Sequence, residues 1–126
     1  MKVLRSSVLI VEDEPLIAWM LEDVVSSLGL EVVGPFPSIR EASSLLDDVT
    51  PEVALLDVNL LDGEIFPIAD QLKSRNVPLI FHTANSKSDE LATRYSGAQV
   101  ITKPSDPQRL QQAIGAARQA SAGMSA

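Results

Sequence analysis

The chain has 126 residues, of which 45% are hydrophobic and 21% charged, and its formal net charge at pH 7 is −7. This length and composition predict one globular domain with its own hydrophobic core, and the acidic balance opposes binding to nucleic acid. The absence of Cys excludes disulfides and thiol-based sites, and no apolar run reaches the ~20 residues of a membrane span. We therefore expect a cytoplasmic protein that binds neither nucleic acid nor a membrane.

Short apolar runs of strand length alternate with segments of helical period along the chain. A first strand is predicted over 8–11, because a continuous apolar run is typical of a strand that is covered on both faces. Pro15 then begins a helix that Gly29 is placed to end, and Trp19 lies on the polar side of this helix. The apolar stripe on the other side consists of Leu16, Ile17, Met20, Leu21, Val24, Val25 and Leu28.

The middle of the chain repeats this alternation. A second strand, 32–33, is predicted to stop at Gly34-Pro35. The following helix begins at Ser38, which with Glu41 forms a capping-box pattern. A third buried strand is predicted over 53–56, and a helix over 65–72 tolerates its proline only in the first turn.

The last third adds two strands and two helices. A fourth strand, 79–81, ends near Thr83, and the stretch 87–96 is predicted to be a weak helix with few apolar residues. A short fifth strand covers 100–101. Asp106-Pro107 caps and begins the last helix, and the small, polar tail 121–126 is expected to fray.

Five strands that alternate with five helices predict an α/β fold with right-handed crossovers and a parallel sheet covered on both faces. The count fits the flavodoxin-like, doubly wound order 2-1-3-4-5. We expect a single domain over 1–126, with a core of about 7–120 and no output domain.

Polar residues follow four of the predicted strands. Glu12 and Asp13 come after the first strand, Asp57 after the third, Thr83 after the fourth and Lys103 after the fifth. In the order 2-1-3-4-5 these strands are neighbours, and sites in open α/β sheets lie beyond the carboxyl ends of the strands. Each residue alone is typical of a solvated loop or a helix cap, but together they predict one pocket.

The chemistry of this pocket points to phosphoryl transfer. Clustered carboxylates repel one another unless a cation intervenes, and Mg²⁺ prefers oxygen ligands and binds phosphate. Asp57 is a candidate nucleophile that forms an aspartyl phosphate, Lys103 supplies a positive charge, and Thr83 supplies a hydroxyl donor. Because the set lacks a general base, the expected outcome is a phosphorylated protein rather than turnover of a substrate.

These residues resemble the response-regulator receiver domains of two-component signalling, over 8–120. The resemblance implies that Asp57 is the phosphoacceptor and that Mg²⁺ is the cofactor. It implies that Glu12, Asp13, Asp57 and the backbone carbonyl of Asn59 bind the metal, and that Thr83 contacts the phosphoryl group. Lys103-Pro104 matches the Lys-Pro pair that follows the fifth strand in this family, which makes Lys103 a further site residue. The phosphoryl donor would be a histidine kinase or a histidine phosphotransfer protein. The implied protein is not an enzyme, is a monomer or a weak homodimer, and signals through contacts with a further protein.

Several positions depart from the usual receiver pattern. Val100 stands where Tyr or Phe is usual, and Ser105 stands where Phe often follows Lys-Pro. The run 78–84 resembles the Pro-Phe-x-Phe-Ala-Thr-Gly motif of an atypical subgroup, with His82 in place of its Ala. We expect His82 to be buried, neutral and directed away from Thr83. We also expect switching to rely on the segment 84–96, or on Tyr95 in place of the missing aromatic residue.

Three other functions compete with this interpretation. A pseudo-receiver would bind partners without phosphorylation, although the candidate site residues are all present. A small phosphatase of the haloacid-dehalogenase type would use a second Asp as acid and base, but this chain has Asn59 there. A flavodoxin would need a Ser/Thr/Gly-rich loop after the first strand, which is absent.

Overall fold

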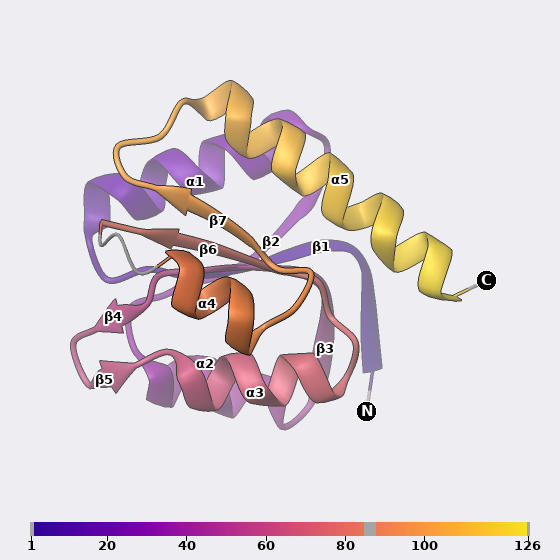
Figure 1. The fold of residues 1–126 in the computed structure, drawn as a ribbon, viewed down its shortest axis with the longest axis horizontal. Helices are drawn as coiled ribbons and strands as arrows, with labels where there is room; N and C mark the ends of the chain where they lie inside the picture. The colour runs from indigo at the N-terminus through magenta and orange to yellow at the C-terminus, as the bar shows by residue number, and fades with distance from the viewer. Residues whose placement is uncertain (1, 85–87, 126) are drawn as a thin grey trace.

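The computed structural model describes residues 2–84 and 88–125. Its main sheet is parallel, with the strands in the order β2-β1-β3-β6-β7 (Figure 1). These strands are β1 (Lys2–Val11), β2 (Glu31–Phe36), β3 (Val49–Leu56), β6 (Leu79–Thr83) and β7 (Gln99–Thr102). Because β6 and β7 are the fourth and fifth strands of this sheet, the predicted order 2-1-3-4-5 is confirmed.

Helices cover both faces of the sheet (Figure 1). They are α1 (Pro15–Ser27), α2 (Ile39–Leu46), α3 (Phe66–Ser74), α4 (Ser88–Arg94) and α5 (Pro107–Ser125). One core cluster joins the sheet to α1 and α5, and a second joins it to α2, α3 and α4. Alternate residues of β1 supply the two clusters, with Val8 and Ile10 on the first face and Leu9 and Val11 on the second.

The strands β1 and β2 are longer than the sequence predicts. The first part of β1, Lys2 to Leu4, pairs with the early residues of β3. The predicted stop at Gly34-Pro35 is wrong, because β2 continues through both residues to Phe36. Proline is tolerated there because β2 is an edge strand, where the N–H that Pro35 lacks is not needed to pair with a further strand. A Cβ at residue 34 would lie 2.8 Å from the backbone oxygen of Ile10, so this close approach requires glycine.

A short antiparallel hairpin, β4 (Asn59–Leu60) with β5 (Gly63–Glu64), follows β3 and was not predicted. Its turn carries Asp62, whose carboxylate oxygens accept the backbone N–H groups of Ile39 at 2.8 Å and Arg40 at 3.1 Å. These bonds lower the pKa of Asp62. The predicted cap is present as well, since the Ser38 hydroxyl accepts the N–H of Glu41. The start of α2 is therefore capped twice, by the adjacent Ser38 and by the distant Asp62.

Three details of the helices differ from the predictions. Leu16 is 79% exposed rather than part of the apolar stripe, because α1 turns Ala18, Leu21, Val24 and Val25 to the core. The helix α4 is better anchored than its sequence indicates, with Leu91 and the adjoining Tyr95 both buried. The helix α5 continues to Ser125, into the segment where fraying is predicted. Part of the predicted switch segment, 85–87, lies outside the described residues.

Candidate functional site

The carboxyl ends of β1, β3, β6 and β7 bring the predicted residues to one edge of the sheet. Parallel-sheet hydrogen bonding continues just past the strand ends. The N–H of Asp57 donates to the carbonyl of Val11 at 2.9 Å, and the N–H of Lys103 donates to the carbonyl of Thr83 at 2.8 Å. The backbone of Asp57 and of Lys103 is therefore fixed by the strands beside it.

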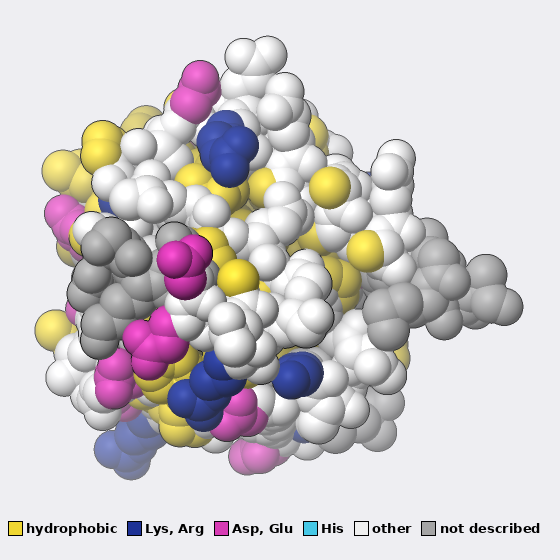
Figure 2. Space-filling model, viewed as in Figure 1, with side chains coloured by type: hydrophobic (Ala, Val, Ile, Leu, Met, Phe, Trp, Pro, Cys, Tyr) yellow, Lys and Arg dark blue, Asp and Glu magenta, His cyan; other side chains and the backbone are white. Residues whose placement is uncertain are grey.

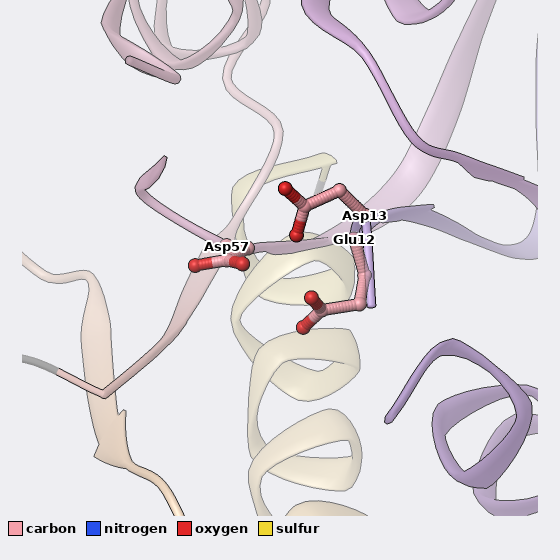
Figure 3. Close-up of side chains that lie close together, drawn as sticks. All are labelled: Glu12, Asp13 and Asp57. Carbon is pink, nitrogen blue, oxygen red and sulfur yellow. The ribbon is translucent and has the colours of Figure 1, made fainter. Parts of the chain in front are cut away.

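Three carboxylates gather at this edge. Glu12, Asp13 and Asp57 each offer an oxygen atom, and these atoms all lie within 4.8 Å of one another (Figure 3). Glu12 and Asp57 are buried, with exposures of 2% and 7%, whereas Asp13 is partly exposed. The predicted cluster therefore forms, with one carboxylate open to solvent.

Lys103 reaches into the cluster from the segment after β7. Its ammonium nitrogen lies 2.9 Å from Oε1 of Glu12 and 3.2 Å from Oδ2 of Asp57. Burial alone would lower the pKa of Lys103, but the carboxylates of Glu12 and Asp57 outweigh it, and the net effect is a raised pKa. Lys103 therefore remains a cation in contact with both buried carboxylates.

Glu12 is the carboxylate that this arrangement perturbs most. Burial raises its pKa to about 7, with the charge of Asp57 adding to the rise and the Lys103 ammonium opposing it. Its Oε2 accepts the N–H of Glu14 at 3.2 Å. Its Oε1 faces Lys103 without hydrogen-bond alignment, and has no other donor among the described residues. This buried oxygen therefore already faces one cation, the Lys103 ammonium, and belongs to the cluster of three carboxylates.

Thr83 and Asn59 lie on the side of the site that faces α4. Thr83 is 1% exposed at the end of β6 and lines a cavity of about 220 Å³, together with Asn59 and Phe66. The backbone N–H of Asn59 approaches Oδ1 of Asp57 at 3.4 Å. The predicted role of the Asn59 carbonyl as a metal ligand stays a prediction.

His82 points to the opposite face of β6 from Thr83, as expected. It is 1% exposed, and burial, followed by the charge of Lys103, lowers its pKa to about 4. The predicted burial of His82 is therefore confirmed, and the direction of the pKa shift favours its neutral form. Its partner, Ser105, is not predicted from the sequence, although both positions depart from the receiver pattern.

Comparison with known proteins tests the resemblance. The family model for the response regulator receiver domain matches residues 8–115. The chain belongs to the response regulator receiver domains. Receiver domains are signalling modules, and this one also has the receiver fold, with five parallel strands and five helices.

Three proteins illustrate what this receiver domain is similar to. The phyllosphere-induced regulator PhyR of Methylorubrum extorquens is 36% identical over 107 residues, which cover 82% of this chain and 40% of that protein. The solution structure of SdrG from Sphingomonas melonis Fr1 has a TM-score of 0.73 at 34% identity and covers 92% of this chain and 95% of its own. The anti-anti-sigma factor PhyR of Bartonella quintana, a mutant structure, has a TM-score of 0.76 at 33% identity and covers 91% of this chain and 49% of its own. The chain therefore spans less than half the length of the PhyR proteins.

The described residues include no helix that is both long and apolar enough to span a membrane. The longest helix, α5, presents Leu110, Ala113, Ile114 and Ala117 to the sheet.

Proposed function

We propose that this receiver domain accepts a phosphoryl group on Asp57 in a reaction that depends on Mg²⁺, and that it signals through protein contacts. The observation that carries the proposal is the meeting of Asp57 with Lys103 and two further carboxylates at the ends of adjacent buried strands. Phosphoryl transfer depends mainly on positioning and on neutralising charge. This arrangement offers both.

The residues present suit a divalent cation. Three carboxylates supply hard oxygen ligands, and one oxygen of each lies within 4.8 Å of the others, with Oε1 of Glu12 also 2.9 Å from the Lys103 ammonium. Glu12, Asp13 and Asp57 would hold the ion, together with the predicted Asn59 carbonyl. When bound, Mg²⁺ would offset the charge of the carboxylates and of the phosphoryl oxygens.

The chain's own groups account for the transfer. An ionised oxygen of Asp57 attacks phosphorus, and a new O–P bond forms while the N–P bond of a phosphohistidine donor breaks. The imidazole nitrogen leaves with the electron pair of that bond. Lys103 holds the Asp57 carboxylate and stabilises the phosphoryl oxygens, and the Thr83 hydroxyl donates a hydrogen bond to one of them. No proton has to be removed from the nucleophile, so no general base is required.

We further propose a histidine kinase or a histidine phosphotransfer protein as the donor and another protein as the target. The similarity to proteins named PhyR, one of them an anti-anti-sigma factor, supports a signalling partner of this kind. A pseudo-receiver remains the competing function, and it predicts partner binding with no phosphoryl adduct.

The test is incubation with Mg²⁺ and acetyl phosphate, followed by intact-mass measurement. The wild-type protein should gain one phosphoryl group, whereas Asp57→Asn, or wild type in EDTA, should gain none. Asp62→Asn is a matched control, because Asp62 is a nearby exposed aspartate that caps α2 and should leave the adduct unchanged. Asp13→Asn should weaken Mg²⁺ binding through loss of a ligand charge. An adduct that persists in Asp57→Asn or in EDTA would overturn the proposal.

A further inference from the structure

A buried histidine lies just behind the candidate site. Nε2 of His82 and the hydroxyl of Ser105 are 2.7 Å apart, which joins β6 to the segment between β7 and α5. The imidazole is 1% exposed, and its Nδ1 has no hydrogen-bond partner among the described residues. Among the described residues, the polar contact of the imidazole is with Ser105, on the α1–α5 side of the sheet.

Ser105 is two residues from Lys103, so this contact acts on a very short segment. The N–H of Lys103 donates to the carbonyl of Thr83, the residue that follows His82. The segment is thus tied to two successive residues of β6, once through the backbone and once through side chains. The next residue, Asp106, accepts the N–H of Gln108 through its carboxylate at 2.9 Å, and this bond fixes the start of α5. Little freedom is left to the backbone that carries the Lys103 side chain.

Stability alone does not explain a histidine in this place. A buried polar group with an unpartnered nitrogen costs free energy that an apolar side chain of the same size would avoid. The two positions also depart together from the receiver pattern, with a large residue in place of Ala before Thr83 and a small one in place of Phe after Lys-Pro. In this chain the contact between the two positions is a directional bond of 2.7 Å.

We propose that His82 is a positioning residue, which through Ser105 holds the Lys103 ammonium against Asp57 for phosphoryl transfer. This inference rests on the proposed function, because the effect is on the transfer to Asp57. His82 touches neither the phosphoryl group nor the metal ligands, and its action is on the geometry of Lys103 alone.

The experiment compares variants that break the bond with variants that keep it. Ser105→Ala removes the hydroxyl, and His82→Phe keeps a ring of similar size but no nitrogen. His82→Gln retains a polar atom near the position of Nε2 and serves as the rescue variant. Ser27→Ala is the matched control, because it removes a serine hydroxyl that accepts from Gln111 between α1 and α5 and has no contact with Lys103.

The readouts are the limiting rate of phosphorylation by acetyl phosphate and the Mg²⁺ affinity, both measured on protein shown to be folded. Ser105→Ala and His82→Phe should lower the limiting rate by about tenfold, a usual cost of losing a group that orients a site residue. Neither should weaken Mg²⁺ binding, since the carboxylates keep their places, and His82→Gln should recover most of the rate. The inference would be overturned if Ser105→Ala were phosphorylated as fast as Ser27→Ala. It would also be overturned if Ser105→Ala or His82→Phe lost Mg²⁺ affinity by the same factor as it lost phosphorylation rate.

A second readout separates this inference from the proposed function. The side-chain resonances of Lys103 in a ¹H–¹³C spectrum report its placement without any phosphoryl group. If wild type forms no adduct, the proposed function fails, yet Ser105→Ala must still shift these resonances more than Ser27→Ala does. Unchanged Lys103 resonances in Ser105→Ala would reject the positioning role whatever the outcome of phosphorylation.

Discussion

The two faces of the sheet are packed in different ways. On the α1–α5 face the hydrophobic core residues among those described are aliphatic, from Val8 and Ile10 to Leu110 and Ile114, and the buried imidazole of His82 lies on the same face. On the α2–α3–α4 face the core includes the rings of Phe81 and Tyr95. The cavity of about 220 Å³ beside Thr83 lies on this second side, between the site, the β4–β5 hairpin and α4.

On the second face, Tyr95 contacts two other aromatic rings and an aspartate. Its ring centroid lies 5.2 Å from that of Phe81 and 6.3 Å from that of Phe66, and its hydroxyl donates to Oδ1 of Asp70 at 2.6 Å. Burial, followed by the bond to Asp70, raises the pKa of Tyr95. Outside the core, Arg94 also pairs with Asp70 at 3.2 Å, and acidic and basic side chains lie together over α3 and α4 (Figure 2).

Tyr95, the residue that directly follows α4, supplies the aromatic ring that β7 lacks. Val100 on β7 is the register partner of Phe81, the residue against which Tyr95 packs. Tyr95 is therefore part of the same core cluster against which Val100 packs. A face with a cavity, a ring at the end of a short helix and polar links at its surface can rearrange, whereas the close-packed aliphatic face resists rearrangement. We infer that a change at Asp57 is transmitted through α4 rather than through α5.

The largest expected effect comes from removing the Tyr95 ring. Tyr95→Ala should cost about 3–5 kcal/mol of unfolding free energy, as for other buried aromatic residues. Tyr95→Phe should cost only about 1 kcal/mol, because the ring stays and one hydrogen bond is lost. Urea unfolding gives both values.

Hydrogen exchange locates the effect of these variants. Tyr95→Phe should speed exchange in α4 and leave α5 unchanged. Equal loosening of both helices would break the distinction between the faces.

A second prediction uses pH. His82 titrates near 6.5 when unfolded and about 4 when folded, so the unfolded state binds the extra proton and stability falls as pH drops through this window. Glu12 titrates near 4.5 when unfolded and about 7 when folded, so the folded state binds the extra proton and stability falls as pH rises through that window. Each effect spans at most about 3 kcal/mol, and in wild type the two largely cancel between about pH 4.5 and 6.5.

Two variants separate these opposing contributions. In His82→Phe, stability should fall as pH rises from 4.5 to 7, whereas in Glu12→Gln it should fall as pH drops from 6.5 to 4. Unfolding free energies measured across this range distinguish the two contributions. A flat profile in both variants would contradict burial as the origin of the two pKa shifts.

The smallest expected effect on the fold concerns the outer side of α1. Trp19 is 68% exposed, as its predicted position on the polar side requires, and Leu16 beside it is also exposed. An exposed aromatic residue of this kind is a docking candidate. Trp19→Ala should change stability by no more than about 0.5 kcal/mol, yet slow phosphotransfer from a histidine kinase roughly tenfold, equivalent to about 1.4 kcal/mol. Phosphotransfer at the wild-type rate would show that Trp19 is not part of the docking face.

The sequence predicts the site better than it predicts the face that would respond to it. Continuous apolar runs ending in Glu12, Asp57 and Lys103 indicate both the strand order and the meeting point, because the carboxyl ends of parallel strands share one edge. The sequence predicts Tyr95 as a substitute for the missing strand aromatic, but its partners Phe81, Phe66 and Asp70 come from distant elements, and no local pattern identifies them. The cap that Asp62 places on α2 spans more than twenty residues, and no local pattern encodes it.

The most direct test of transmission through α4 is hydrogen exchange on the unmodified protein and on its complex with Mg²⁺ and beryllofluoride, a mimic of the phosphoryl group. We predict that, on binding, protection from exchange changes in residues 88–96 and stays the same in residues 109–118. In Asp57→Asn, protection should stay the same in both segments. Unaltered protection of 88–96 in the complex, or an equal change in α5, would contradict the account.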